Sequence, residues 1–113
     1  MKLLTKAIEA KLKKFPLGSQ DGKGNPEIIV KFFTPDSNWT WFVTEGEQHP
    51  SGEWEFFGLV EGHESELGYF YSSQLESIRG GFGLPVERDL HFSGCVVDLD
   101  SYPMKAVKYV KPV

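Results

Sequence analysis

The sequence predicts an α+β fold in which an N-terminal amphipathic helix packs on an antiparallel β-sheet meander, together with a second short helix. Apolar residues recur at helical spacing near the N-terminus, at Leu4, Ile8, Leu12 and Phe15. Three later segments are rich in β-branched and aromatic residues, and short polar turns separate them. Strands that follow one another through short loops favour antiparallel pairing, which gives the meander.

The first helix is predicted over residues 3–15, with lysines around the rest of its circumference. Pro16 and Gly18 end it, because proline cannot continue a helix and glycine favours its termination. A polar, glycine-rich loop follows. The meander strands are then predicted at residues 27–33, 39–45 and 53–60.

Shorter elements follow the meander. We expect a strand at residues 67–71 and a short helix that begins at Ser72 or Ser73. This helix ends after Ile78, and another strand is expected at residues 86–92. The last segment is a tail, residues 93–113, whose apolar residues lack a clear period. Edge strands are expected there at residues 96–97 and 107–110.

Aromatic residues crowd the predicted sheet, and their alternation assigns most of them to a core. Trp39, Trp41 and Val43 share one face of their strand. The helix needs such a face to cover, so we expect it to be buried with apolar residues of the neighbouring strands: Ile28, Val30, Phe32, Trp54, Phe56 and Val60. The other face keeps Phe33, Phe42, Phe57 and Leu59. Either later elements cover that second face or it is a partly apolar surface patch.

The length and composition of the chain fit one domain over residues 1–113, and its net charge is −4. Cys95 is the one cysteine, which excludes an internal disulfide. No apolar run reaches the roughly 20 residues of a membrane helix, and the first residues lack the apolar centre of a secretory signal. We therefore expect a cytoplasmic protein without membrane contact.

Charge is distributed unevenly. Residues 32–78 contain no Lys or Arg, but they hold many acids: Asp36, Glu45, Glu47, Glu53, Glu55, Glu61, Glu64, Glu66 and Glu76. Such a block repels the backbone of nucleic acids and attracts basic surfaces. A solvated sheet rim without a partner is the alternative interpretation.

The GHESE segment, residues 62–66, sets an imidazole beside carboxylates. His63 with these acids could bind a divalent metal or act in acid–base chemistry. Zinc normally requires a third protein ligand, and the spacing of His49, His91 and Cys95 does not predict that they converge. A hydrogen-bonded histidine in a turn is the simpler interpretation, so we predict neither a metal nor another cofactor.

The chain resembles the bacterial and phage family catalogued as domain of unknown function 2958. The resemblance covers residues 1–92 and rests on the opening MKLLTKAI and three segments: KFFTPDSNWTW (31–41), FFGLVEGHESELGYFYSSQLESIRG (56–80) and GLPVERDLHF (83–92). It implies carriage on phages, plasmids and other mobile genetic elements. It also implies that the family includes anti-CRISPR proteins, which inhibit a type II Cas9 nuclease by binding.

The leading hypothesis is therefore a non-enzymatic accessory protein that binds a basic protein, with an anti-CRISPR inhibitor of a type II Cas effector as its concrete form. Such effectors hold nucleic acid in a positively charged channel, which an acidic protein can occupy. The predicted contacts are the acids Asp36, Glu45, Glu47, Glu61, Glu64 and Glu66, with Trp39 and Tyr69 as aromatic anchors. One alternative is a small metal-binding protein, hydrolytic or not, centred on His63 and nearby carboxylates. Another is an aromatic sheet face that binds a carbohydrate or another small ligand.

Overall fold

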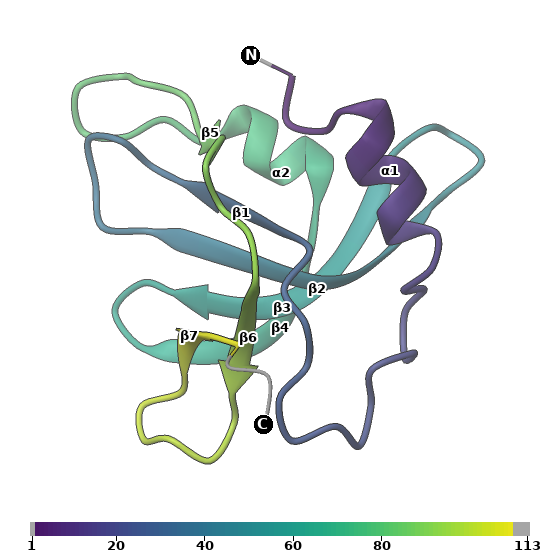
Figure 1. The fold of residues 1–113 in the computed structure, drawn as a ribbon. Helices are drawn as coiled ribbons and strands as arrows, with labels where there is room; N and C mark the ends of the chain where they lie inside the picture. The colour runs from purple at the N-terminus through teal and green to yellow at the C-terminus, as the bar shows by residue number, and fades with distance from the viewer. Residues whose placement is uncertain (1, 110–113) are drawn as a thin grey trace.

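The computed structural model describes residues 2–109 and contains one meander sheet, two short helices and a separate hairpin (Figure 1). The five-stranded sheet has the order β4-β3-β2-β1-β5, and β6 pairs with β7 in a two-stranded sheet. All of these pairings are antiparallel, which confirms the predicted α+β class. The elements are α1 (Lys6–Leu12), β1 (Val30–Phe33), β2 (Thr40–Gln48), β3 (Trp54–Glu61), β4 (Ser65–Tyr71), α2 (Ser72–Ser77), β5 (Glu87–Arg88), β6 (Cys95–Asp98) and β7 (Lys105–Lys108).

Helix α1 is shorter than the helix predicted over residues 3–15. Its start is fixed by Thr5, whose hydroxyl accepts a hydrogen bond from the Ile8 N–H at 3.2 Å. At its end, the Phe15 N–H donates to the Leu12 carbonyl at 2.8 Å, which tightens the last turn. The apolar stripe still packs into the core as predicted, through Leu4, Ile8, Leu12 and Phe15.

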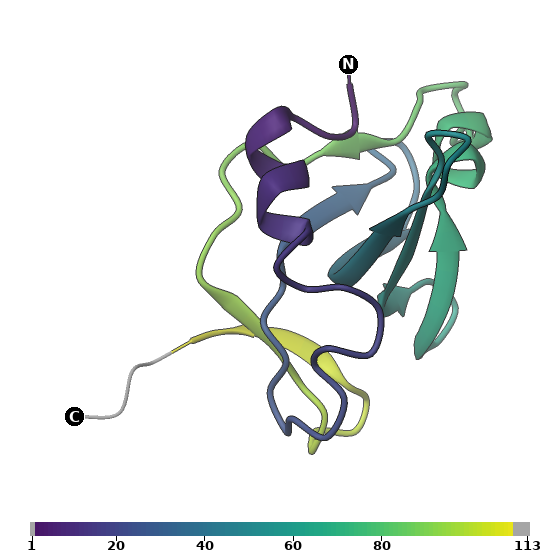
Figure 2. The same ribbon diagram turned by 90° about the vertical axis from the view of Figure 1, so that its right-hand side faces the viewer.

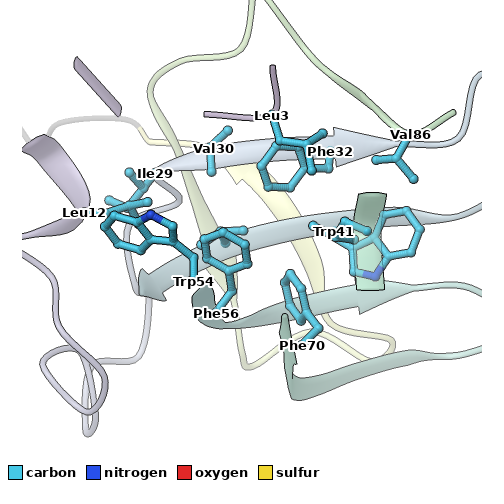
Figure 3. Packing of buried hydrophobic residues seen from close by; sticks show 12 residues of the cluster. Leu3, Leu12, Ile29, Val30, Phe32, Trp41, Trp54, Phe56, Phe70 and Val86 are labelled. Carbon is cyan, nitrogen blue, oxygen red and sulfur yellow. The ribbon is translucent and has the colours of Figure 1, made fainter. Parts of the chain in front are cut away.

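The main core lies on the sheet face that α1 and α2 cover (Figures 2 and 3). Phe56 is its centre: its ring lies 6.0 Å from that of Phe32, 5.7 Å from Phe70 and 6.3 Å from Trp54. Most residues that alternation assigned to this face are buried in it: Val30, Phe32, Trp41, Val43, Trp54 and Phe56, with Val60 packed against them.

A second, smaller core lies on the opposite face, where the β6–β7 hairpin covers the sheet. Phe42, Leu59 and Val97 are buried there. Later elements therefore cover this face where Phe42 and Leu59 lie, as the first of the two alternatives predicted. Phe92 and several residues of the tail pack against the same cluster; those of the tail are Cys95, Leu99, Met104 and Ala106.

Ile28 belongs to this second core and not, as predicted, to the first. Its N–H donates to the Cys95 carbonyl at 3.0 Å, and Glu27 forms a bridge with Val96. The chain before β1 is therefore held by β6, and β1 begins only at Val30. This is the physical reason why the strand predicted over residues 27–33 is shorter at its start.

The remaining elements also differ in length from their predictions. β2 runs on to Gln48, and β4 begins at Ser65. The strand predicted over residues 86–92 is reduced to β5, because the Asp89 carboxylate accepts from the His91 N–H at 2.9 Å and turns the chain. The edge strands predicted in the tail fall on β6 and β7, but β7 ends at Lys108, so Tyr109 lies beyond it, and Val110 lies outside the described residues. Within residues 2–109, no helix is both long and apolar enough to cross a membrane.

Candidate partner-binding surface

The turn between β3 and β4 carries the residues of the GHESE segment. Glu61 and Ser65 close the hairpin as cross-strand partners, and the Gly62 N–H donates to the Glu64 carbonyl at 3.0 Å. His63 and Glu64 are exposed in this turn. The tight turn therefore presents an imidazole and a carboxylate to solvent at one end of the sheet.

Trp39 lies against this turn and not in the core. Its ring contacts His63 edge-on at 5.7 Å and stacks on Trp41 at 6.1 Å. It also covers Gly62 so closely that a Cβ there would lie 2.3 Å from the indole. With 37% of its surface exposed, Trp39 forms the rim between the buried Trp41 and solvent. We call the surface made by Trp39, Glu61, His63, Glu64 and Glu66 the acidic tip.

The carboxylates of the acidic tip have no basic partner among residues 2–109. Within residues 2–109, neither an ion pair nor a side-chain hydrogen bond involves Glu61, Glu64 or Glu66. The two basic residues that bracket the acidic block are engaged elsewhere: Lys31 pairs with Asp89 at 3.6 Å, and Arg79 donates to backbone carbonyls of α2 and the residue after it. No described residue therefore forms an ion pair that compensates the negative charge of the tip.

Two open depressions flank the acidic tip. One, of about 290 Å³, is lined by Trp39, Val60, His63, Glu64 and Glu66. The other, of about 660 Å³, lies between the β3–β4 turn and residues 102–104 and includes Glu61. Because Glu66 pairs with Val60 and Glu61 with Ser65, their side chains start on opposite faces of the sheet. The tip therefore offers acids to a partner from both sides.

Glu45 is not part of any exposed surface, which corrects its prediction as a contact residue. It is 2% exposed, and its carboxylate accepts from the Gly18 N–H at 2.7 Å and the Gln20 N–H at 2.9 Å. A register shift between Val43 and Glu45 in β2 places it opposite Phe57, under the loop that follows α1. Glu45 therefore holds a loop to the sheet.

Asp36 is also engaged inside the protein. Its Oδ2 accepts from the Phe82 N–H at 2.7 Å and the Leu84 N–H at 3.3 Å, so it ties the β1–β2 turn to the loop before β5. Its Oδ1 is buried close against Gly80 and has no hydrogen-bond partner in the described part of the chain. A carboxylate used in this way is poorly placed to meet another protein.

Glu47 and Tyr69 are exposed but lie away from the acidic tip. Glu47 pairs with Glu55 near the far end of β2, whereas Thr40, at the near end, pairs with Glu61. At about 3.3 Å per residue, this separates Glu47 from the tip by roughly 20 Å. Tyr69 lies in the middle of β4, where its ring packs on Phe57 at 4.8 Å. The structure therefore brings together Trp39, Glu61, Glu64 and Glu66 of the predicted contacts, but not the other four.

The metal alternative receives no geometric support. Among residues 2–109, no three side chains of His, Cys, Asp or Glu converge as metal ligands. His63 instead contacts the Trp39 ring.

Sequence reasoning missed the turn of the β6–β7 hairpin as a neighbour of the tip. Tyr102, Pro103 and Met104 line the larger depression, and Tyr102 is fully exposed. The signal was present in the run DLDSYP at residues 98–103, because Asp, Ser and Pro are typical turn residues. What the sequence did not show was that this turn folds back beside His63.

Comparison with known proteins gives one family match. The family model described as "Protein of unknown function (DUF2958)" matches residues 3–109, which extends beyond the 1–92 of the resemblance into the β6–β7 hairpin. Neither the curated proteins nor the solved structures give a match to this chain.

Proposed function

The chain belongs to the DUF2958 family, and we propose that it acts by binding a basic protein partner through the acidic tip, without catalysing a reaction. The observation that carries this proposal is the absence, within residues 2–109, of any ion pair to Glu61, Glu64 or Glu66. Uncompensated carboxylates at one end of a rigid sheet are a surface that basic side chains complement.

The exposed indole adds a second means of recognising a cation. Arg and Lys are attracted to the face of a Trp ring, and they form charge-assisted hydrogen bonds with carboxylates. Trp39 and Glu66 line the same depression, so one basic side chain could meet both. Partly exposed aromatics of this kind carry much of the energy of protein interfaces.

A type II Cas9 nuclease is the partner that we propose to test first, and inhibition of its function is the proposed outcome of binding. The nucleic-acid channel of such nucleases is positively charged, which complements the acidic tip. The family resemblance implies the same role and a setting on phages or other mobile elements. The acids that surround the tip also disfavour direct contact with nucleic acid.

The decisive experiment compares two triple charge reversals. The tip variant is E61K/E64K/E66K, and the matched control is E47K/E76K/D100K, which reverses three exposed acids elsewhere. Each reversal adds two charges, so both variants change the net charge from −4 to +2. Affinity for a guide-loaded type II Cas9 is measured by biolayer interferometry, and both variants are first checked for native thermal unfolding.

We expect the tip variant to lose at least tenfold in affinity while the control stays within about threefold of the natural chain. An equal loss in both variants would mean that net charge alone drives binding. Full affinity of the tip variant would contradict the proposal outright. If Cas9 does not bind the natural chain, immobilised natural chain and tip variant are compared for capture of purified basic effectors from the same host.

A further inference from the structure

One edge of the five-stranded sheet is long and open. β4 pairs with β3 over its whole length, Ser65–Tyr71, without a register shift, and within residues 2–109 no strand pairs with its other side (Figure 1). Natural proteins usually blunt such edges with short strands, lysines, prolines or bulges. β4 contains no lysine and no proline. It therefore presents a row of backbone groups that another strand can use.

The opposite edge shows how this chain protects an edge. β5 has only two residues, Glu87 and Arg88. The Arg88 guanidinium donates to the Lys2 and Leu3 carbonyls at 2.6 and 2.9 Å, which fastens the N-terminal segment beside β5. At the other edge, no strand among residues 2–109 lies beyond β4. The contrast singles out β4 as the edge that is available for pairing.

Side chains on β4 form an apolar strip on one face. Leu67 is 40% and Tyr69 65% exposed, and both lie on the face of the second core. A depression of about 220 Å³ is lined by Phe57, Leu67 and Leu99 among other residues, and the Tyr69 ring packs on Phe57. The strip is therefore exposed apolar surface directly next to an open strand edge.

On its other face, β4 contributes Glu66 to the acidic tip. Glu66 alternates with Leu67, so it lies on the face of Trp39 and Val60. Since residues 32–78 contain no Lys or Arg, two copies of this edge would bring like charges together, whereas a basic strand would be attracted. A strand that alternates basic and apolar residues matches both faces at once.

We propose that β4 accepts an extended segment of the basic partner as an additional antiparallel or parallel strand of the sheet. Backbone hydrogen bonds to residues 65–71 supply affinity, and alternate side chains supply specificity. Apolar residues of the segment pack on Leu67 and Tyr69, and its Lys or Arg residues approach Glu66 and Trp39. This inference rests on the proposed function, since it names how the basic partner is held.

The test uses the full chain and a defined probe, the acetylated and amidated peptide KVKVKVK. Its control, KPKPKPK, has the same charge but lacks the valine N–H donors and does not form strands. Amide hydrogen exchange is followed by NMR with saturating peptide. With the valine peptide, we expect the outward-facing amides in residues 65–71 to exchange at least tenfold more slowly than in the free protein. With the proline peptide, we expect their exchange rates to be unchanged. Unchanged exchange at these residues, or equal protection by both peptides, overturns the inference.

A pair of variants separates this inference from the proposed function. L67K/Y69K places two lysines on exposed positions of the edge and leaves the acids of the tip in place. We expect it to weaken binding of the basic partner at least tenfold and to abolish the peptide-induced protection. If E61K/E64K/E66K weakens binding of the basic partner while L67K/Y69K binds it with full affinity, the result supports binding through the acidic tip and overturns strand addition at β4. A concentration-dependent dimer of the natural chain that protects residues 65–71 would also overturn the inference, because a second copy would then occupy the edge.

Discussion

Gly58 of β3 and Gly68 of β4 are cross-strand partners, yet only one of them has space for a side chain. A Cβ at Gly58 would lie 1.9 Å from the carbonyl oxygen of Phe42, whereas a Cβ at Gly68 would have no atom within 4 Å. Gly58 also pairs with Val43, where the register shift of β2 begins. The backbones of β2 and β3 therefore approach closely at a point where neither can move without disturbing both cores.

This difference predicts opposite outcomes for two alanine substitutions. Gly58→Ala should destabilise the protein by about 3 kcal/mol or more, because the clash is with backbone and cannot be relieved by a rotamer change. Gly68→Ala should change stability by less than about 1 kcal/mol. Urea unfolding followed by tryptophan fluorescence measures both, and similar midpoints for the two variants would contradict the packing described here.

Glu45 and Glu47 lie two residues apart in β2 and provide a matched pair. Glu45→Ala removes the acceptor of the Gly18 and Gln20 N–H groups, so we expect a loss of about 3 kcal/mol. Glu47→Ala removes an exposed side chain and should cost less than about 0.5 kcal/mol. Chemical denaturation gives both values. Hydrogen exchange should also show faster exchange of the Gly18 and Gln20 amides in the Glu45 variant, and protection that persists there would argue against the tether.

The β6–β7 turn contains a titratable carboxyl with a local donor. The Ser101 hydroxyl donates to Asp98 Oδ2 at 2.6 Å, and this bond is the main reason why the pKa of Asp98 lies below its ordinary value. Because the pKa is lowered in the folded protein, Asp98 contributes stability above its ordinary pKa and loses it as the pH falls through the lowered value. Ser101→Ala should raise the pKa of Asp98, as measured by carbon-detected NMR titration. Ser93→Ala, which removes an exposed hydroxyl outside this turn, should leave it unchanged.

The second core predicts a contrast within the same hairpin. Val97 is fully buried against Phe42 and Leu59, whereas Tyr102 is fully exposed. Val97→Ala should cost about 2 kcal/mol through lost burial and a cavity, and Tyr102→Ala less than about 0.5 kcal/mol. Thermal unfolding monitored by circular dichroism checks both. Equal effects would mean that the hairpin is not packed as the structure shows.

Binding through the acidic tip should also depend on salt. Affinity of the natural chain for its basic partner should fall as ionic strength rises from about 0.1 to 0.5 M, because screening weakens contacts between charges. For E61K/E64K/E66K the slope of affinity against salt should be clearly smaller. A slope that is the same for both chains would indicate that these acids do not face the partner.

The sequence was sufficient to predict the class of the fold because the periodic signals were strong. The helical stripe through Leu12 and the alternation of Phe32, Trp41 and Phe56 reflect burial on one face of each element. It was insufficient for Ile28, whose position depends on hydrogen bonding to Cys95 far along the chain. Pairings of that kind leave no local pattern in a single sequence.

The candidate site was predictable only in part, for a related reason. A glutamate in a polar run has the same appearance whether it is free or tethered, and only the bulge in β2 buries Glu45. Trp39 continued the alternation of a buried strand, yet it precedes the first paired residue of β2 and so reaches the rim. The uneven charge distribution, by contrast, was enough to predict three contact residues of the tip, because no Lys or Arg lies within residues 32–78. These residues are Glu61, Glu64 and Glu66.

The position of the β6–β7 hairpin affects how the protein is made. Phe42 and Leu59 leave the ribosome well before Val97, which closes over them. A nascent chain that stops before Val97 therefore lacks the residue that closes over Phe42 and Leu59. Because exposed apolar surface makes incomplete chains prone to aggregation, we expect such a chain to aggregate more readily than the finished protein.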